Sequence, residues 1–165
     1  MKKVILFICT VIIAGCYSKK AEIKKIGLEG KPMPTIDLIA ADSITHINTD
    51  NIKPGKPTIL FSFEPWCPYC RAQTNSMLSQ IDKLKDVNIY MLCTSRYSMF
   101  KEFYKKHELA KYPNIAAGID YKRSFDHYFQ LTGVPCLAIY GADKKLKQVM
   151  EGKNYISTIK EATSN

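Results

Sequence analysis

The chain has 165 residues, of which 46% are hydrophobic and 24% charged, and its formal net charge at pH 7 is +9. These values are typical of a globular protein and exclude collagen-like, coiled-coil and intrinsically disordered chains. The lysines are scattered along the sequence instead of forming one basic run, so we expect no nucleic-acid partner.

The first fifteen residues have the pattern of an export signal. Two lysines precede an apolar run over residues 4–13, which is shorter than the roughly 20 residues of a transmembrane helix. The run is followed by Ala-Gly-Cys, ending at Cys16, and this sequence resembles the lipobox of bacterial lipoproteins. The resemblance implies cleavage before Cys16 and a lipid on its sulfur. A plain secretory signal with an incidental cysteine is the alternative.

Removal of this signal divides the chain into three parts. Residues 1–15 are the signal peptide, residues 16–30 a polar, lysine-rich tether, and residues 31–165 one domain. A lipid on Cys16 would anchor the domain to a membrane of the cell envelope, facing the periplasm. Tyr17 is not the Asp that retains some lipoproteins at the inner membrane, which slightly favours the outer membrane.

Four cysteines remain in the domain, and two of them form its only C-x-x-C pair, Cys67 and Cys70. Arg71 follows the pair where a c-type haem site would have His. The chain has no second C-x-x-C and no histidine pair at zinc-ligand spacing. We therefore expect neither a metal nor another cofactor.

The cysteine pair lies where a strand is followed by a helix. Residues 57–63 are apolar and β-rich, and apolar positions recur at helical spacing from Cys70 to Leu84. Pro68 falls in the first turn, where proline loses no hydrogen bond. Unpaired N–H groups at this helix end stabilise a thiolate on Cys67, with Cys70 one turn deeper. The pattern predicts a nucleophile and a resolving thiol, and an inert disulfide is the alternative.

The rest of the chain supplies scaffold elements. Residues 88–93 predict the next strand, and aromatic side chains at helical spacing predict two helices, over residues 100–107 and 125–129. Residues 135–140 and 146–150 predict an antiparallel hairpin, and residues 155–159 a closing helix. We expect His107 to be partly buried and hydrogen-bonded.

A Gly-Val-Pro segment at residues 133–135 follows the Trp-Cys-x-x-Cys motif by about 65 residues. Together with the strand and the helix around the motif, this resembles the thioredoxin superfamily, most closely the TlpA/ResA-like branch of membrane-tethered thiol–disulfide oxidoreductases. Residues 33–38 resemble the N-terminal strand of that branch, and residues 48–56 its lead-in to the central strand. The resemblance implies an α/β fold, a three-layer α/β/α sandwich with a central mixed β-sheet.

The resemblance also implies roles for individual residues. A cis peptide bond precedes Pro135, which packs against the cysteine pair, and Val134 pairs its backbone with the bound substrate. Trp66 forms one wall of the site. The positions that support the two cysteines are thus Trp66, Pro68, Tyr69, Val134 and Pro135 (cis).

The resemblance further implies a reductase of the cell envelope whose substrates are protein thiols or disulfides. Such an enzyme needs a membrane electron donor or acceptor as its redox partner. We expect it to work as a monomer.

Several positions depart from the family pattern. The buried acid six residues before the first cysteine is replaced by Phe61, a Glu three residues after the second cysteine by Gln73, and a helix-kinking proline by Asn75. Glu64 is the only carboxylate near the motif. It is a candidate proton relay for Cys70, and a surface acid without a catalytic role is the alternative.

The other two cysteines, Cys93 and Cys136, are expected to be buried thiols. In the sheet order of the family, they lie on strands either side of the central strand. A bridge between them would have to cross two strand spacings, about 9 to 10 Å, which is too far for a disulfide.

Two other functions remain open. One is a peroxidase of the same superfamily that uses Cys67, although the Pro, Thr and Arg that usually surround a peroxidatic cysteine are absent. The other is a non-catalytic metal-binding lipoprotein, although copper-carrying relatives tend to have C-x-x-x-C with a downstream His.

Overall fold

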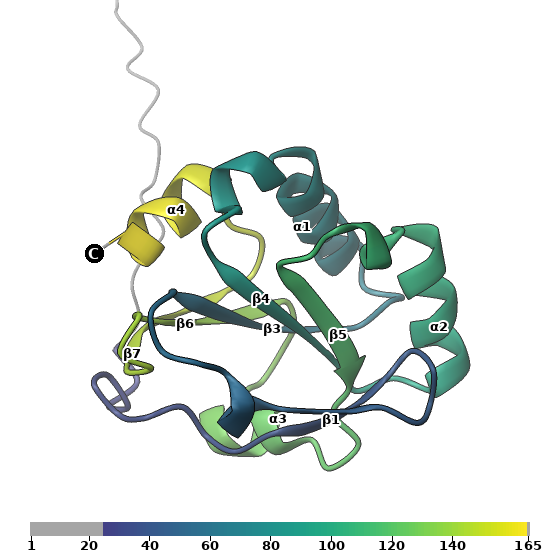
Figure 1. The fold of residues 1–165 in the computed structure, drawn as a ribbon, viewed down its shortest axis with the longest axis horizontal. Coiled ribbons are helices and arrows are strands. Elements are labelled where there is room, and N and C mark those ends of the chain that lie inside the picture. The colour runs from purple at the N-terminus through teal and green to yellow at the C-terminus, as the bar shows by residue number, and fades with distance from the viewer. Residues whose placement is uncertain (1–24, 165) are drawn as a thin grey trace, which may run out of the picture.

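The computed structural model describes residues 25–164. The predicted signal peptide, the predicted lipidation site Cys16 and most of the predicted tether lie outside these residues. Within them, a seven-stranded mixed sheet is flanked by helices on both faces (Figure 1). The sheet order is β2-β1-β5-β4-β3-β6-β7.

The described residues form seven strands, four α-helices and three 3₁₀ helices. The strands are β1 (Asp37–Ala40), β2 (His46–Asn48), β3 (Thr58–Phe63), β4 (Asn88–Cys93), β5 (Ile115–Ile119), β6 (Cys136–Tyr140) and β7 (Leu146–Glu151). The α-helices are α1 (Pro68–Ser79), α2 (Tyr97–Lys106), α3 (Ser124–Phe129) and α4 (Ile156–Ser164). Short 3₁₀ helices are η1 (Thr49–Asn51), η2 (Ile81–Leu84) and η3 (Leu109–Lys111).

The strand β3 lies inside the sheet, between β4 and β6, and is buried at all of its positions. It runs parallel to β4 and antiparallel to β6. Because side chains alternate along a strand, Phe61 and Phe63 pack into the core on one face and Leu60 into the core on the other. A strand covered on both faces reads as a nearly continuous apolar run, which is why residues 57–63 are recognisable as a strand in the sequence although Thr58 and Ser62 are polar.

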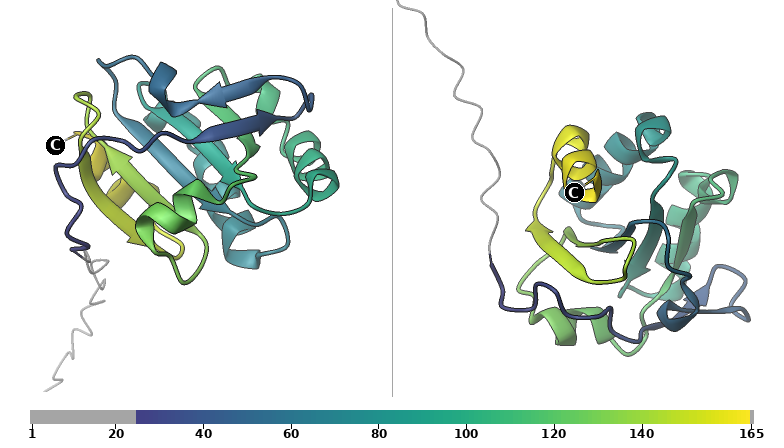
Figure 2. Two further views of the ribbon diagram at one scale, coloured as in Figure 1. Left: turned by 90° about the horizontal axis from the view of Figure 1, so that it is seen from below. Right: turned by 60° about the vertical axis from the view of Figure 1, so that its left-hand side comes forward.

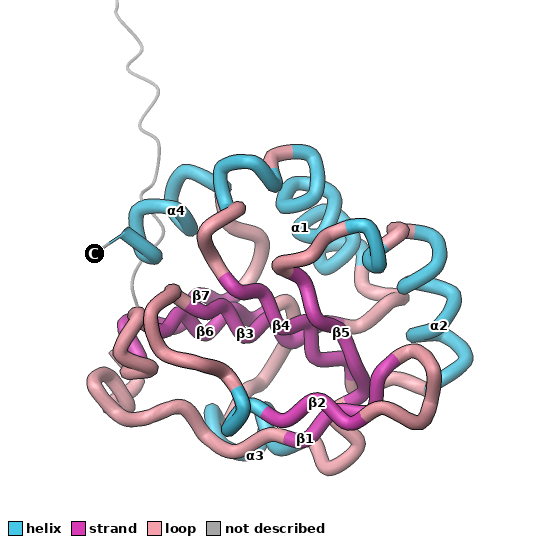
Figure 3. Tube along the Cα trace, in the orientation of Figure 1, coloured by secondary structure: helices cyan, strands magenta, loops and turns pink. Residues whose placement is uncertain are grey.

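Two cores lie on opposite faces of the sheet. On one face, α1, α2 and α4 contribute side chains such as Met77, Phe103 and Ile159. On the other face, α3 contributes Phe125 and Phe129. Figure 3 shows the strands as a layer between α3 and the other three helices. The predicted α/β/α sandwich with a mixed sheet is confirmed.

The helix after the cysteine pair is shorter than its apolar spacing predicts. The α-helix ends at Ser79, because Gln80 leaves the helical conformation with φ −126° and ψ 29°. The chain continues as the 3₁₀ helix η2, whose last residue Leu84 is still completely buried. The apolar spacing therefore marks the buried side correctly but spans two separate elements.

Other predicted elements are confirmed, with two differences. The strands β3 and β4 and the hairpin of β6 and β7 lie where the sequence places them. The N-terminal strand β1 begins at Asp37, whereas residues 33–38 resemble that strand in the sequence. The strands β2 and β5 have no counterpart among the predicted elements.

The segment before β1 is bound to the turn between β6 and β7 and to the first residue of β7. The N–H of Gly30 donates to Leu146 at 2.8 Å, the N–H of Leu146 to Lys31 at 2.9 Å, and the N–H of Met33 to Lys144 at 3.1 Å. This turn follows Tyr140, whose partner on β3 is Thr58, the first residue of that strand. The described chain therefore enters the domain at the amino end of β3 (Figure 2).

Candidate active site

Cys67 is the N-cap residue of α1, directly after the loop that leaves β3. Its Sγ accepts a hydrogen bond from the backbone N–H of Cys70 at 3.4 Å, as a serine oxygen does at an N-cap. Pro68 occupies the first turn, where its missing N–H costs nothing. The side chain of Cys67 is only 5% exposed. The predicted position of this cysteine at a helix N-terminus is confirmed.

Cys70 lies one turn further along α1 and is completely buried. Burial raises the pKa of its thiol well above the ordinary value. A hydrogen bond with the backbone of Glu64 lowers this pKa in part, whereas the negative charge of the Glu64 carboxylate raises it. Cys67 and Cys70 are both free thiols in this structure. The pair thus consists of one sulfur close to the surface and one protonated sulfur behind it.

The loop before β6 lies against the first cysteine. The peptide bond between Val134 and Pro135 is cis, the isomer that the resemblance implies. The Cys67 thiol donates to the carbonyl oxygen of Val134 at 3.7 Å. Val134 is half-buried and Pro135 buried. Because β6 is antiparallel to β3, the start of β6 meets the end of β3, and this brings the two segments together.

Three residues around the pair form an exposed rim. Trp66 is 61% exposed and Tyr69 is 64% exposed, and Pro68 is exposed as well. Exposed aromatic side chains that lie close together, as these two do on either side of Cys67, are typical of surfaces that contact other molecules.

Glu64 is a half-buried carboxylate fixed by two hydroxyl groups. One of its oxygens accepts from the Thr94 hydroxyl and the other from the Ser95 hydroxyl. The contact follows from topology, because β3 and β4 are parallel and their carboxyl ends lie side by side. Glu64 follows β3, and Thr94 and Ser95 follow β4. The sequence indicates Glu64 but not its two partners, which are 30 and 31 residues away.

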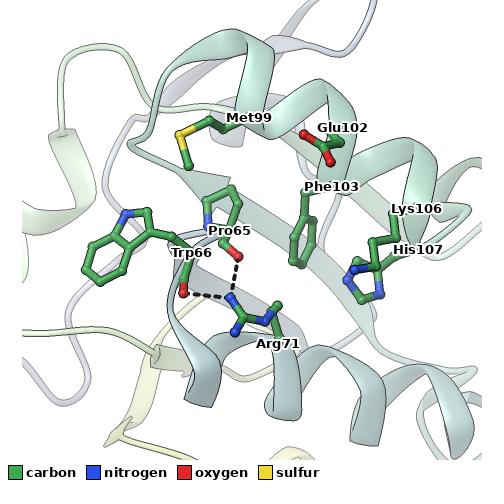
Figure 4. A pocket seen from close by; sticks show the side chains of 8 residues that line it. All are labelled: Pro65, Trp66, Arg71, Met99, Glu102, Phe103, Lys106 and His107. Atoms are coloured by element: carbon green, nitrogen blue, oxygen red, sulfur yellow. Dashed lines mark hydrogen bonds between the residues drawn. The ribbon is translucent and has the colours of Figure 1, made fainter.

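Arg71 was not predicted as part of the site. Its Nη1 donates to the backbone oxygens of Pro65, at 3.1 Å, and of Trp66, at 2.6 Å (Figure 4). The guanidinium of α1 thereby holds the loop that presents Trp66 and Cys67. The sequence gives no signal for this role, because Arg71 stands out there only as the residue that replaces the His of a c-type haem site.

Two cavities lie on either side of Trp66. The Val134 cavity, of about 200 Å³, is lined among others by Glu64, Trp66, Thr94, Arg123, Thr132 and Val134. The α2 cavity, of about 360 Å³, is lined by Pro65, Trp66, Arg71, Phe103, Lys106 and His107, with Met99 and Glu102 at its edge (Figure 4).

His107 was expected to be partly buried and hydrogen-bonded. It is half-buried, but within residues 25–164 its Nε2 atom has no hydrogen-bond partner. The expectation of a bonded ring is therefore wrong for this nitrogen. The backbone N–H of His107 caps the end of α2. This cap fixes the backbone of the residue but gives no partner to the ring nitrogen.

Cys93 and Cys136 lie on opposite faces of the sheet. Cys93 is paired with Phe63 and Cys136 with Ser62, so their side chains point away from each other. Both are completely buried free thiols, and burial raises the pKa of each to about 12. The prediction of two buried thiols without a bridge agrees with this arrangement.

In the part of the chain that the structure describes, no group of three or more His, Cys, Asp or Glu side chains could hold a metal ion. No helix between residues 25 and 164 combines the length and the apolar character that a bilayer span requires.

Solved structures with similar folds come from several bacteria. StoA from Bacillus subtilis has a TM-score of 0.61 and 17% identity, over 79% of this chain and 96% of its own. The thioredoxin domain of a thiol-disulfide oxidoreductase from Bacteroides vulgatus has a TM-score of 0.65 and 16% identity, over 82% and 95%. A secreted Mycobacterium tuberculosis disulfide oxidoreductase, homologous to E. coli DsbE, has a TM-score of 0.62 and 19% identity, over 79% and 94%.

A comparison with curated proteins finds no match. The structural likenesses establish the fold alone, because all three sequence identities are below 20%. The family follows from the sequence itself, because residues 28–162 match the Redoxin family. The chain therefore belongs to the Redoxin family, within the thioredoxin superfamily of oxidoreductases, as its resemblance to the TlpA/ResA-like branch predicted.

Proposed function

We propose that this protein is a thiol–disulfide oxidoreductase that exchanges disulfides with protein substrates through Cys67 and Cys70, as a reductase of the bacterial cell envelope. One observation carries the proposal: the Cys67 sulfur accepts the N–H of Cys70 at the start of α1, while the Cys70 thiol lies buried behind it. Two of the proteins with similar structures are described as a thiol-disulfide oxidoreductase and a disulfide oxidoreductase.

The first step is attack by Cys67 on a substrate disulfide. The thiolate forms a bond to one substrate sulfur as the substrate S–S bond breaks, and the other substrate sulfur leaves as a thiolate that takes up a proton. The N–H of Cys70 and the dipole of α1 stabilise the attacking anion. The product is a mixed disulfide between Cys67 and the substrate.

Cys70 performs the second step. Its thiol loses a proton and attacks the Cys67 sulfur, which releases the second substrate thiolate and leaves a Cys67–Cys70 disulfide. Two electrons have then passed from the pair to the substrate. Because burial keeps Cys70 protonated, the step needs a base. Glu64 is our candidate, because its charge acts on the Cys70 thiol and two hydroxyl groups fix its carboxylate.

We assign substrate binding to the exposed rim and to the loop before β6. Val134 presents its half-buried backbone beside Cys67, where it can pair with an extended substrate segment, and Pro135 supports that loop. Trp66 forms the wall between the two cavities. Pro68 and Tyr69 are open for contact.

The location is inferred from the sequence before the domain. A lipid on Cys16 would tether the domain to a membrane on its periplasmic side, where an oxidising environment supplies disulfides to reduce. A membrane donor would then return two electrons to the Cys67–Cys70 disulfide in each cycle. Tyr17 is our reason to favour the outer membrane.

The experiment combines turnover with trapping of the intermediate. The reduced protein should reduce insulin disulfides, Cys67→Ala should lose this activity, and Cys70→Ala should accumulate a mixed disulfide at Cys67 that mass spectrometry detects. Cys93→Ala is the matched control, because it removes the same atom from a buried cysteine outside the pair and should retain turnover.

Failure of Cys70→Ala to form a mixed disulfide would contradict the assignment. Rapid peroxide consumption by the same variant would instead favour the peroxidase. The direction of electron flow is tested by the reduction potential of the pair, which for a reductase should lie near the lower end of the range of about −270 to −120 mV.

A further inference from the structure

The α2 cavity plays no part in the exchange chemistry, yet it adjoins the reacting cysteine. Pro65 and Trp66, which directly precede Cys67, form one of its walls, and the face of α2 forms the other. Figure 4 shows Trp66 at one end of the cavity, Lys106 and His107 at the other, and Arg71 between them. Its volume of about 360 Å³ is large enough to admit an amino-acid side chain.

The polar lining of this cavity consists mainly of hydrogen-bond donors. Arg71 uses only Nη1 in its contacts with Pro65 and Trp66, and within the described chain no hydrogen bond is made by its Nε or Nη2. Lys106 forms no ion pair with any residue of the described range. Glu102 is the single carboxylate of the lining, so the two cations leave a net positive charge.

His107 adds a ring that is neutral at physiological pH. Burial lowers the pKa of this imidazole, and the positive charge of Lys106 lowers it further. Its Nε2 atom has no partner inside the described chain. A neutral imidazole donates one hydrogen bond, and an acceptor inside the cavity suits such a donor better than a second cation does.

The remaining lining is apolar. Phe103 is only 4% exposed, and its ring packs against that of His107 with centroids 4.2 Å apart. Pro65 and Met99 extend this surface. A ligand group that combines an aliphatic stem with a terminal carboxylate matches a cavity lined by both apolar side chains and cationic donors.

Trp66 connects this cavity to the place where the substrate backbone binds. Its side chain lines both the α2 cavity and the Val134 cavity. A segment that pairs with Val134 and crosses Trp66 therefore directs a side chain close to its own cysteine into the α2 cavity.

We propose that the α2 cavity binds a glutamate or aspartate side chain of the protein substrate, close in sequence to the cysteine that reacts with Cys67. The inference rests on the proposed function and narrows it, because it defines a class of substrates by the charge beside their cysteine. Arg71 and Lys106 would hold the carboxylate.

The test measures how fast the reduced full-length protein reduces disulfide-bonded peptides. Glu is scanned through the positions on either side of the reacting cysteine, with Gln as the neutral partner at each position. We expect one position at which the Glu peptide has a kcat/KM about fivefold higher than the Gln peptide, the factor that a partly exposed ion pair supplies. Added salt should reduce this preference, since it screens exposed charges.

Lys106→Glu should abolish the preference for Glu at that position. Lys105→Glu is the matched control, because it makes the same charge change one residue away in the last turn of α2, outside the cavity lining. It should retain at least most of the preference.

Equal rates for Glu and Gln at every position, or equal loss in both lysine variants, would overturn the proposed subsite while leaving exchange at Cys67 intact. No reaction with any peptide would contradict the proposed function and the subsite with it.

Discussion

The side-chain oxygen of Gln73 accepts a 2.6 Å hydrogen bond from the backbone N–H of Asn154. The contact joins α1, which carries the cysteine pair, to the segment that leads into α4. Gln73 is completely buried, and its amide nitrogen has no hydrogen-bond partner among the described residues. A neutral acceptor is therefore required at this position, whereas a charge would be buried without compensation.

Gln73→Glu tests this requirement through the pH dependence of stability. The new carboxyl retains the acceptor for Asn154, but burial raises its pKa in the folded state. The variant should match the parent below about pH 4 and lose about 1.4 kcal/mol per pH unit above the unfolded-state pKa of about 4.3, until the folded-state pKa is reached. Urea unfolding at pH 4 and pH 7 measures this. Gln80→Glu, at a more open position, should show no such loss, and equal behaviour of the two variants would refute the argument.

Glu64→Gln should slow the second step of exchange but not the first. Removal of the base leaves the Cys70 proton in place, and general base catalysis contributes about 10² or more to such transfers. Stopped-flow measurements of mixed-disulfide formation and decay separate the two steps. Glu108→Gln, an exposed change on the loop after α2, is the control. An unchanged decay rate and pH profile would remove Glu64 from the mechanism.

Cys93 and Cys136 should make the fold less stable at alkaline pH. Burial raises the pKa of both thiols to about 12, whereas a cysteine in the unfolded chain has a pKa of about 8.5. The unfolded chain therefore loses these protons first as the pH rises. The stability that the two thiols contribute is present below about pH 8.5 and is lost as the pH approaches 12. Thermal melts of the parent and of the Cys93→Ala/Cys136→Ala variant should show a steeper alkaline decline in the parent. Parallel curves would contradict this.

Gly118→Ala should destabilise the contact between β5 and β1. A Cβ on Gly118 would lie 2.8 Å from the Cβ of Leu38 and 2.9 Å from the backbone oxygen of Ile39. Overpacking of this kind costs about 1 to 3 kcal/mol, and a shift in the urea midpoint measures it. Around Gly133 nothing lies within 4 Å, so Gly133→Ala should change stability by no more than about 1 kcal/mol. Equal effects of the two substitutions would show that β1 and β5 move apart to accommodate the methyl group.

The sequence predicts the elements that are buried on both faces or that begin with clear signals. Residues 57–63 and 88–93 are apolar strands, and Pro68 after Cys67 marks the start of α1. The strand β5 has the sequence Ile-Ala-Ala-Gly-Ile, whose small residues give no β-signal, and Gly118 is explained only by its approach to β1. The end of α1 at Ser79 was missed because apolar spacing continues through η2.

The residues of the candidate site also divide into those that the sequence predicts and those that it does not. Cys67, Cys70 and the cis bond at Pro135 follow from a motif and from resemblance. The partners of Glu64 and the role of Arg71 depend on which strand ends are adjacent and on where one guanidinium points. Such contacts between distant segments leave no periodic signal in the sequence.

The hydrogen bonds of residues 30–33 to Lys144 and Leu146 fix where the described chain enters the domain relative to Cys67. Cys67 follows the carboxyl end of β3, whereas the chain enters at the amino end, about 20 Å away for six residues at 3.3 Å each. The point of entry and the Cys67 sulfur therefore lie at opposite ends of β3. The described residues that lead into the domain line neither of the two cavities beside Trp66, so they leave the surroundings of Cys67 uncovered.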